Sequence, residues 1–232
     1  MNWSTLVKVV RFHLADWLGY TLLLWATQAF SFAVNLAIFA NVPATPGKAP
    51  YTGALVTIYI VFAIVGARSI SRSLPFAFAL GLSRRSYYAG TALLAVVLAA
   101  VNGLALTILS LIERATGGWG LSLHFFRVPY LLAGPWYLTW LTSFAGLALM
   151  FVYGMWFGLI YRRWNLAGVL TFTAAQVTVV VTALLIATRA HAWPGVGRFF
   201  TTLTITGLTG LLIALAIALL VGGYATMRRI TV

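Results

Sequence analysis

Residues that could carry out catalysis or bind a metal are scarce in this chain. Its 232 residues include two acidic ones, Asp16 and Glu113, with three histidines in separate segments and no cysteine. Acid/base pairs, nucleophile triads and metal clusters all need more such groups held close together. There is no G-x-x-x-x-G-K-[ST] phosphate loop, since Gly47-Lys48 is followed by Ala49. We therefore expect no catalytic residue, metal site or cofactor here, and no enzyme activity.

The composition points to lipid as the solvent of this chain. Hydrophobic residues make up 62% and charged residues 7%, against about 25% charged in soluble domains. Continuous apolar runs of about 20 residues, without alternation, favour membrane helices over a barrel. The net charge of +13 would fit nucleic acid, but the bases flank the apolar runs and so favour membrane lipids as partners. The sequence predicts an all-α integral membrane protein with no nucleic-acid partner.

The most informative pattern lies between the second and third apolar runs, in ARSISRSLPFAFALGLSRRSYYAG, residues 67–90. Pro75 suits the first turn of a helix, and Gly81 suits the position where one ends. Ser83 can cap the next span, with Arg84 and Arg85 in the headgroups. A short helix near 73–82, parallel to the membrane, would present Leu74, Phe76, Phe78 and Leu80. Such exposed aromatic residues indicate a docking surface, or else an anchor in the bilayer interface.

Residues 1–16 have the helical spacing of an amphipathic helix in the interface plane, and 17–232 form the transmembrane domain. Six apolar runs are predicted to span the membrane. They are about Leu18–Ala40, Tyr51–Ala67, Tyr88–Ile112, Tyr137–Tyr161, Leu166–Thr188 and Phe200–Ala225.

The distribution of bases predicts that both termini are cytoplasmic. Six spans would sort the bases into an inner set of ten and an outer set of five. The inner set is Lys8, Arg11, Arg68, Arg72, Arg84, Arg85, Arg162, Arg163, Arg228 and Arg229, and the outer set is Lys48, Arg114, Arg127, Arg189 and Arg198.

Several residues inside or beside the spans should have packing roles. Gln28 and Asn35, seven residues apart, would share a face that meets protein and could line a path or a dimer contact. Glu113 is expected to pair with Arg114, and the segment up to Pro135 to fold back onto the interface. Small residues four apart, Gly154/Gly158 and Ala214/Ala218, would allow close helix packing.

This organisation resembles the membrane subunit of a type-2 ATP-binding-cassette exporter. The stretch SLPFAFALGLSRRSYYAGTALL, residues 73–94, looks like one seen in many small bacterial permeases. IERATGGWG, residues 112–120, and VRFHLADWL near the start look like the actinobacterial members. Such permeases often carry re-entrant helices between their last two spans, whereas Arg189–Phe199 is too short for a helical hairpin.

The resemblance implies a permease in the bacterial cell membrane that exports a drug, a peptide or a lipid-like compound. It would form its path with a second copy or a sibling, and two separate ATPase subunits would bind ATP and Mg. By position, the family's coupling helix corresponds to Leu74, Pro75, Phe76, Phe78, Leu80 and Gly81, with Arg84 and Arg85 beside it.

Two other functions remain open from the sequence. One is a membrane protein that transports nothing, such as an immunity, sensor or assembly subunit. The other is an ion-coupled carrier, which the lack of carboxylates within the predicted spans disfavours.

Overall fold

The computed structural model describes residues 21–41, 52–79, 81–128, 132 and 134–228. The predicted amphipathic helix at 1–16 and Leu80 lie outside these residues. The described elements are all helical: α2 (Leu23–Asn41), α3 (Val56–Ser71), α4 (Ser73–Ala79), α5 (Arg84–Ala115), η2 (Gly118–Ser122), α6 (Trp136–Arg189), α7 (Trp193–Thr202) and α8 (Ile205–Met227). The all-α prediction is confirmed. By length and composition α2, α5, α6 and α8 can cross a membrane, whereas α3 is apolar but shorter.

α6 contains both the fourth and the fifth predicted spans. Its 54 residues would extend about 80 Å if straight, far beyond the roughly 30 Å of a hydrocarbon core. The helix is broken at Asn165, where φ is 54° and ψ is −152°. This combination lies outside the left-handed helical region and close to one that is nearly restricted to glycine, so the backbone at Asn165 is strained. The chain therefore reverses there with almost no connecting loop.

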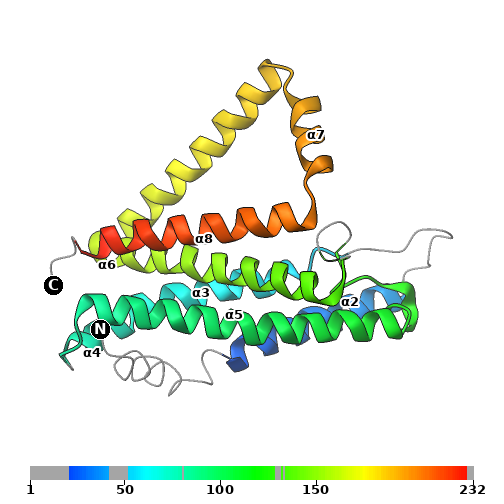
Figure 1. Cartoon of the computed structure of the whole chain (residues 1–232), viewed down its shortest axis with the longest axis horizontal. Helices are drawn as coiled ribbons and strands as arrows, with labels where there is room; N and C mark the ends of the chain where they lie inside the picture. The colour runs from blue at the N-terminus through cyan, green and yellow to red at the C-terminus, as the bar shows by residue number, and fades with distance from the viewer. Residues whose placement is uncertain (1–20, 42–51, 80, 129–131, 133, 229–232) are drawn as a thin grey trace.

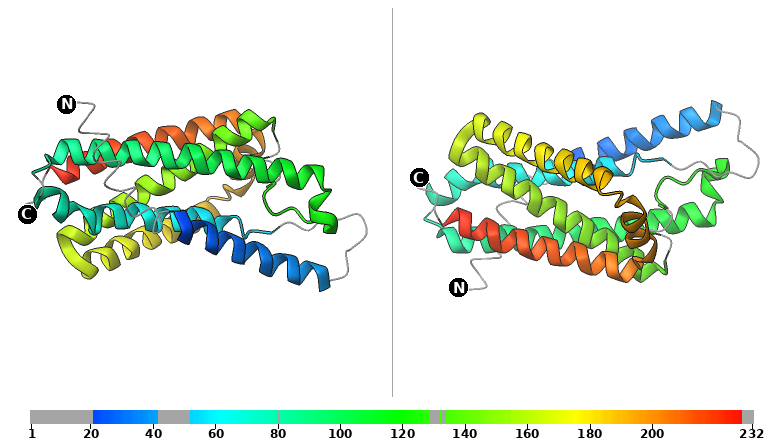
Figure 2. Two further views of the ribbon diagram at one scale, coloured as in Figure 1. Left: turned by 90° about the horizontal axis from the view of Figure 1, so that it is seen from below. Right: turned by 90° about the horizontal axis from the view of Figure 1, so that it is seen from above.

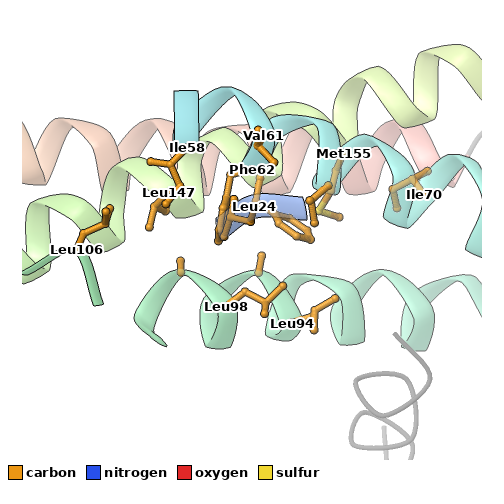
Figure 3. Packing of buried hydrophobic residues seen from close by; sticks show 14 of the residues in the cluster. Leu24, Ile58, Val61, Phe62, Ile70, Leu94, Leu98, Leu106, Leu147 and Met155 are labelled. Carbon is orange, nitrogen blue, oxygen red and sulfur yellow. The ribbon is translucent and has the colours of Figure 1, made fainter. Parts of the chain in front are cut away.

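The core lies among α3, α5, the first half of α6 and the beginning of α2. Leucine, isoleucine and phenylalanine side chains from these helices point toward one another (Figure 3), and Phe62, Leu94 and Phe151 are among the fully buried ones. α8 packs on the first half of α6, where the indole of Trp156 donates to the carbonyl of Leu219 at 2.8 Å. α2 diverges from the other helices after its first turns (Figure 2).

α3 and α6 cross in backbone contact, because glycine occupies the crossing. A Cβ at Gly66 would overlap the carbonyl oxygen of Phe151, and one at Gly154 would overlap that of Ala63. A Cβ at Gly158 would lie 2.7 Å from the carbonyl oxygen of Ala67. Close packing through Gly154 and Gly158 is therefore confirmed. The other small pair, Ala214 and Ala218, is exposed on α8.

The second half of α6 leaves the bundle at an angle, and α7 returns the chain to the start of α8 (Figure 1). Nearly every residue from 177 to 202 is exposed, although most of them are apolar. α7 has no buried residue and is a single helix, in agreement with the expected absence of a hairpin between the last two spans. The final predicted span began too early, because Phe200 belongs to α7 and α8 starts at Ile205.

The arginines gather mainly at one end of the bundle, which we call the basic end. α4, the reversal at Asn165 and the last turn of α8 all lie there (Figure 1). The described bases at this end are Arg68, Arg72, Arg84, Arg85, Arg162, Arg163 and Arg228. Arg114 and Arg127 belong to the opposite end, and Arg189 and Arg198 belong to the tip of α6 and to α7, which stand away from the bundle (Figure 1).

Candidate functional site

The short helix predicted from residues 67–90 is present at the basic end as α4. It begins at Ser73, which places Pro75 in its first turn, and its last residue is Ala79. Gly81 follows with φ of 76°, and its N–H donates to the carbonyl of Phe78 at 2.9 Å. Ser83 then caps α5, accepting from the N–H of Ser86 at 3.2 Å. The predicted helix, its stop and the following cap are all confirmed.

α4 turns part of its apolar surface toward the bundle. Leu74 is 3% exposed and Ala77 is fully buried, so both anchor the helix to its neighbours. Phe78 is half-buried, and Ala79 and Gly81 are exposed. The apolar surface that α4 exposes is therefore smaller than the sequence predicted, because part of it is buried against the bundle.

Arg84 connects three elements at this end. Its guanidinium lies 5.9 Å from the ring centroid of Phe78 on α4, and its Nη1 donates to the carbonyl of Arg228 after α8 at 3.4 Å. Arg85 is exposed. The two arginines predicted to act alike therefore differ, since Arg84 bridges helices and Arg85 faces outward.

Two tyrosines that the sequence reasoning did not single out fix the start of α5. The hydroxyl of Tyr87, which is fully buried, donates to the carbonyl of Ser69 near the end of α3. The hydroxyl of Tyr88 donates to the carbonyl of Leu220 on α8 at 2.8 Å. Together they attach α5 to α3 and to α8. The sequence feature that could have indicated this role is the pair of adjacent tyrosines that follows Arg84, Arg85 and Ser86.

Replacing Tyr87 with phenylalanine should lower the stability of the folded protein by about 1–2 kcal/mol, because the carbonyl of Ser69 loses its buried donor. Thermal unfolding in detergent measures this. Tyr161→Phe is the matched control, since Tyr161 is 46% exposed, and it should leave the transition unchanged. Equal effects of the two variants would contradict this role of Tyr87.

Gln28 and Asn35 do not share one open surface. Gln28 is 1% exposed inside the bundle, and its amide atoms have no hydrogen-bond partner among the described residues. Asn35 lies further along, where α2 diverges, and its Nδ2 donates to the carbonyl of Ser31 at 2.8 Å. It lines a groove of about 560 Å³, which we call the α2 groove. Polar side chains of the groove are Thr27, Ser31, Asn35 and Thr57.

Glu113 performs a different task from the one predicted. It is 1% exposed, whereas Arg114 is exposed, so the expected ion pair between them is wrong. Its carboxylate accepts from the backbone N–H groups of Phe125 at 3.0 Å, Phe126 at 2.8 Å and Arg127 at 3.1 Å. The indole of Trp119 donates to it at 3.2 Å. Consecutive N–H groups of this kind form a concave anion site, here filled by the chain's own carboxylate.

The segment around Glu113 forms an aromatic cap, which we define as Trp119, Phe125 and Phe126 packed on Phe32 of α2. The ring centroid of Phe32 lies 4.9 Å from that of Trp119, 5.1 Å from that of Phe125 and 5.5 Å from that of Phe126. The described part of this segment covers α2, and its fold-back onto the membrane interface stays a prediction. The cap closes the end of the bundle opposite α4.

Comparison of the chain with protein-family models, curated proteins and solved structures gives no match.

Proposed function

We propose that this chain is the permease subunit of an ATP-binding-cassette exporter, with six spans and both termini in the cytoplasm. Two copies, or one copy and a sibling, would enclose the path, and two separate ATPase subunits would dock at the basic end. The observation that carries this proposal is α4, a short helix at the most cationic end of the bundle that packs on α3 and α5, with α5 in turn bonded to α3 and to the chain after α8. The proposal places this end in the cytoplasm because basic residues concentrate on that side of membrane proteins.

The contacts of α4 suit a coupling element. Leu74 and Ala77 hold it against the bundle, Arg84 lies over Phe78, and Tyr87 and Tyr88 hold the start of α5 to α3 and α8. A push on α4 would therefore reach several spanning helices rather than bend one loop. ATP binding would draw the ATPases together, and α4 would pass that movement into the helices.

The α2 groove supports a path or a contact with a second permease. Polar side chains on the outside of an apolar helix are unfavourable against lipid tails, so they indicate protein or an aqueous passage. Thr27, Ser31 and Asn35 recur every four residues along this surface, beside apolar Phe30 and Val34. Such mixed walls suit an amphipathic or hydrophobic cargo.

The double variant Phe76→Ala plus Phe78→Ala tests the coupling role. We expect transport to fall about tenfold, because the aromatic contacts that anchor an interface are lost, while the chain still inserts into the membrane. The measurement is ATP-dependent cargo uptake into inverted vesicles, together with ATP hydrolysis by the complex. Hydrolysis should continue without transport.

The matched control is Phe199→Ala plus Phe200→Ala, two exposed phenylalanines on α7, which lies away from the basic end. This pair should leave coupling unchanged. Transport that survives the α4 variant would contradict the role of α4. Uptake that stops when the proton gradient is collapsed, while ATP remains high, would indicate an ion-coupled carrier. Purification in mild detergent without any ATPase would favour a protein that transports nothing.

A further inference from the structure

The basic end carries a groove formed by the reversal of α6 against α8. It has a volume of about 400 Å³, and its walls include Trp156, Ile160 and Phe172, with Ala225 and Thr226 on the side of α8. A second groove of about 490 Å³ adjoins it, since the two share Ile160, Trp164 and Phe172. We call the first of these the elbow groove. Its surface is mainly hydrocarbon, with one fixed charge at the rim.

That charge belongs to Arg163. Its guanidinium carbon lies 4.5 Å from the ring centroid of Trp164, an arrangement that holds the group by a cation–π contact and leaves its N–H edge open. Arg163 has no carboxylate partner among the described residues. The only described acid, Glu113, is at the far end of α5, and that helix of 32 residues is about 48 Å long.

The elbow groove lies beside the reversal, and the two halves of α6 separate further along. The two halves of α6 contact each other at its inner part, where the rings of Phe157 and Phe172 lie 5.4 Å apart and Tyr153 donates to Gln176 at 2.9 Å. Beyond Gln176 the helix diverges and its side chains are exposed. In a bilayer, lipid tails have direct access to this wedge.

We propose that the elbow groove binds one anionic phospholipid per chain. Its phosphate would meet the guanidinium of Arg163, and its acyl chains would lie along Ile160 and Phe172 into the two adjoining grooves. Charge complementarity selects an anionic headgroup, since Arg162 and Arg228 are at the same end and no described acid is. Arg163 would also lie at the depth of a lipid phosphate, because arginines at the ends of spans lie at headgroup level. This proposal rests on the membrane location and is independent of transport.

The test is native mass spectrometry of the full chain released from nanodiscs that contain phosphatidylcholine and phosphatidylglycerol. The wild-type chain should retain one phosphatidylglycerol. Arg163→Gln should reduce that retention about tenfold, because a charge-assisted contact is lost. Arg198→Gln, which removes an exposed arginine of α7 away from the basic end, is the matched control and should retain the lipid.

A second pair of variants tests the groove without changing charge. Ala225→Trp should fill the elbow groove and exclude the lipid, whereas Ala214→Trp, at another exposed position of α8, should not. Inorganic phosphate should not displace the lipid, because it lacks the acyl chains. Equal loss of phosphatidylglycerol in Arg163→Gln and Arg198→Gln would mean that general surface charge retains the lipid, and this would overturn the site. Retention in Ala225→Trp, or equal retention of phosphatidylcholine, would overturn it too.

Discussion

Replacing Glu113 with alanine should release the aromatic cap and destabilise the protein by about 3–5 kcal/mol. The variant leaves three backbone N–H groups and the indole N–H of Trp119 without their acceptor in a buried setting. Losses of this size are typical when a buried hydrogen-bonded charge is removed and its partners stay behind. Thermal unfolding in detergent measures the loss. Chymotryptic cleavage near Phe125 should also become about tenfold faster, because the segment opens locally.

Two further variants separate this interpretation from the ion pair expected from the sequence. Glu113→Gln keeps one acceptor oxygen, so its stability should lie between that of Glu113→Ala and that of the wild type. Arg114→Gln should have no measurable effect, since Arg114 is exposed and makes no ion pair with Glu113. If Arg114→Gln destabilised the protein as much as Glu113→Gln, the result would support an ion pair between Glu113 and Arg114. It would contradict the role of Glu113 in holding the aromatic cap.

Replacing Gly154 with valine should separate α3 from α6 and cost about 3–5 kcal/mol. Any Cβ at this position overlaps the carbonyl of Ala63, which is backbone and cannot rotate away as a side chain would. Overpacking in a tight core usually costs about 1–3 kcal/mol, and the need to move a whole helix raises this value. We expect the melting temperature in detergent to fall by about 10 °C.

Gly210→Val in α8 is the matched control. A Cβ there meets nothing within 4 Å, and the residue is exposed. The control removes a glycine from a helix long enough to span a membrane, as Gly154→Val does, but should leave the melting temperature within about 2 °C of the wild type. A similar fall in both variants would mean that helix propensity, rather than the crossing, sets the effect.

Local signals in the sequence predicted the local structure well. Pro75, Gly81 and Ser83 defined the start, stop and cap around α4, because each acts on backbone groups within a few residues of itself. Gly154 and Gly158 also indicated a close helix crossing correctly. The signals around α4 depend on geometry that neighbouring residues impose, whereas the glycine pair indicated a close approach without indicating that α3 is the partner.

Contacts between distant segments were not predictable in the same way. The partners of Glu113 are 6 to 14 residues away in a segment without a regular period, so the sequence favoured its neighbour Arg114 as the partner. The attachment of Tyr88 to α8 joins residues 132 positions apart. Gln28 and Asn35 have equivalent helical phase, but α2 leaves the bundle between them, and no sequence period records that divergence.

The reversal at Asn165 has a mechanical consequence for everything that follows it. The helix from Leu166 onward is held against the first half of α6 as far as Gln176, and beyond that residue it continues to Arg189 as an exposed rod about 20 Å long. A tilt of this rod by about 10° would carry its tip through about 3 Å, and α7 with it. The displacement of the tip in any outward movement is thus set by the length of the rod rather than by the flexibility of a loop. Shortening the rod by one turn would reduce that displacement in proportion.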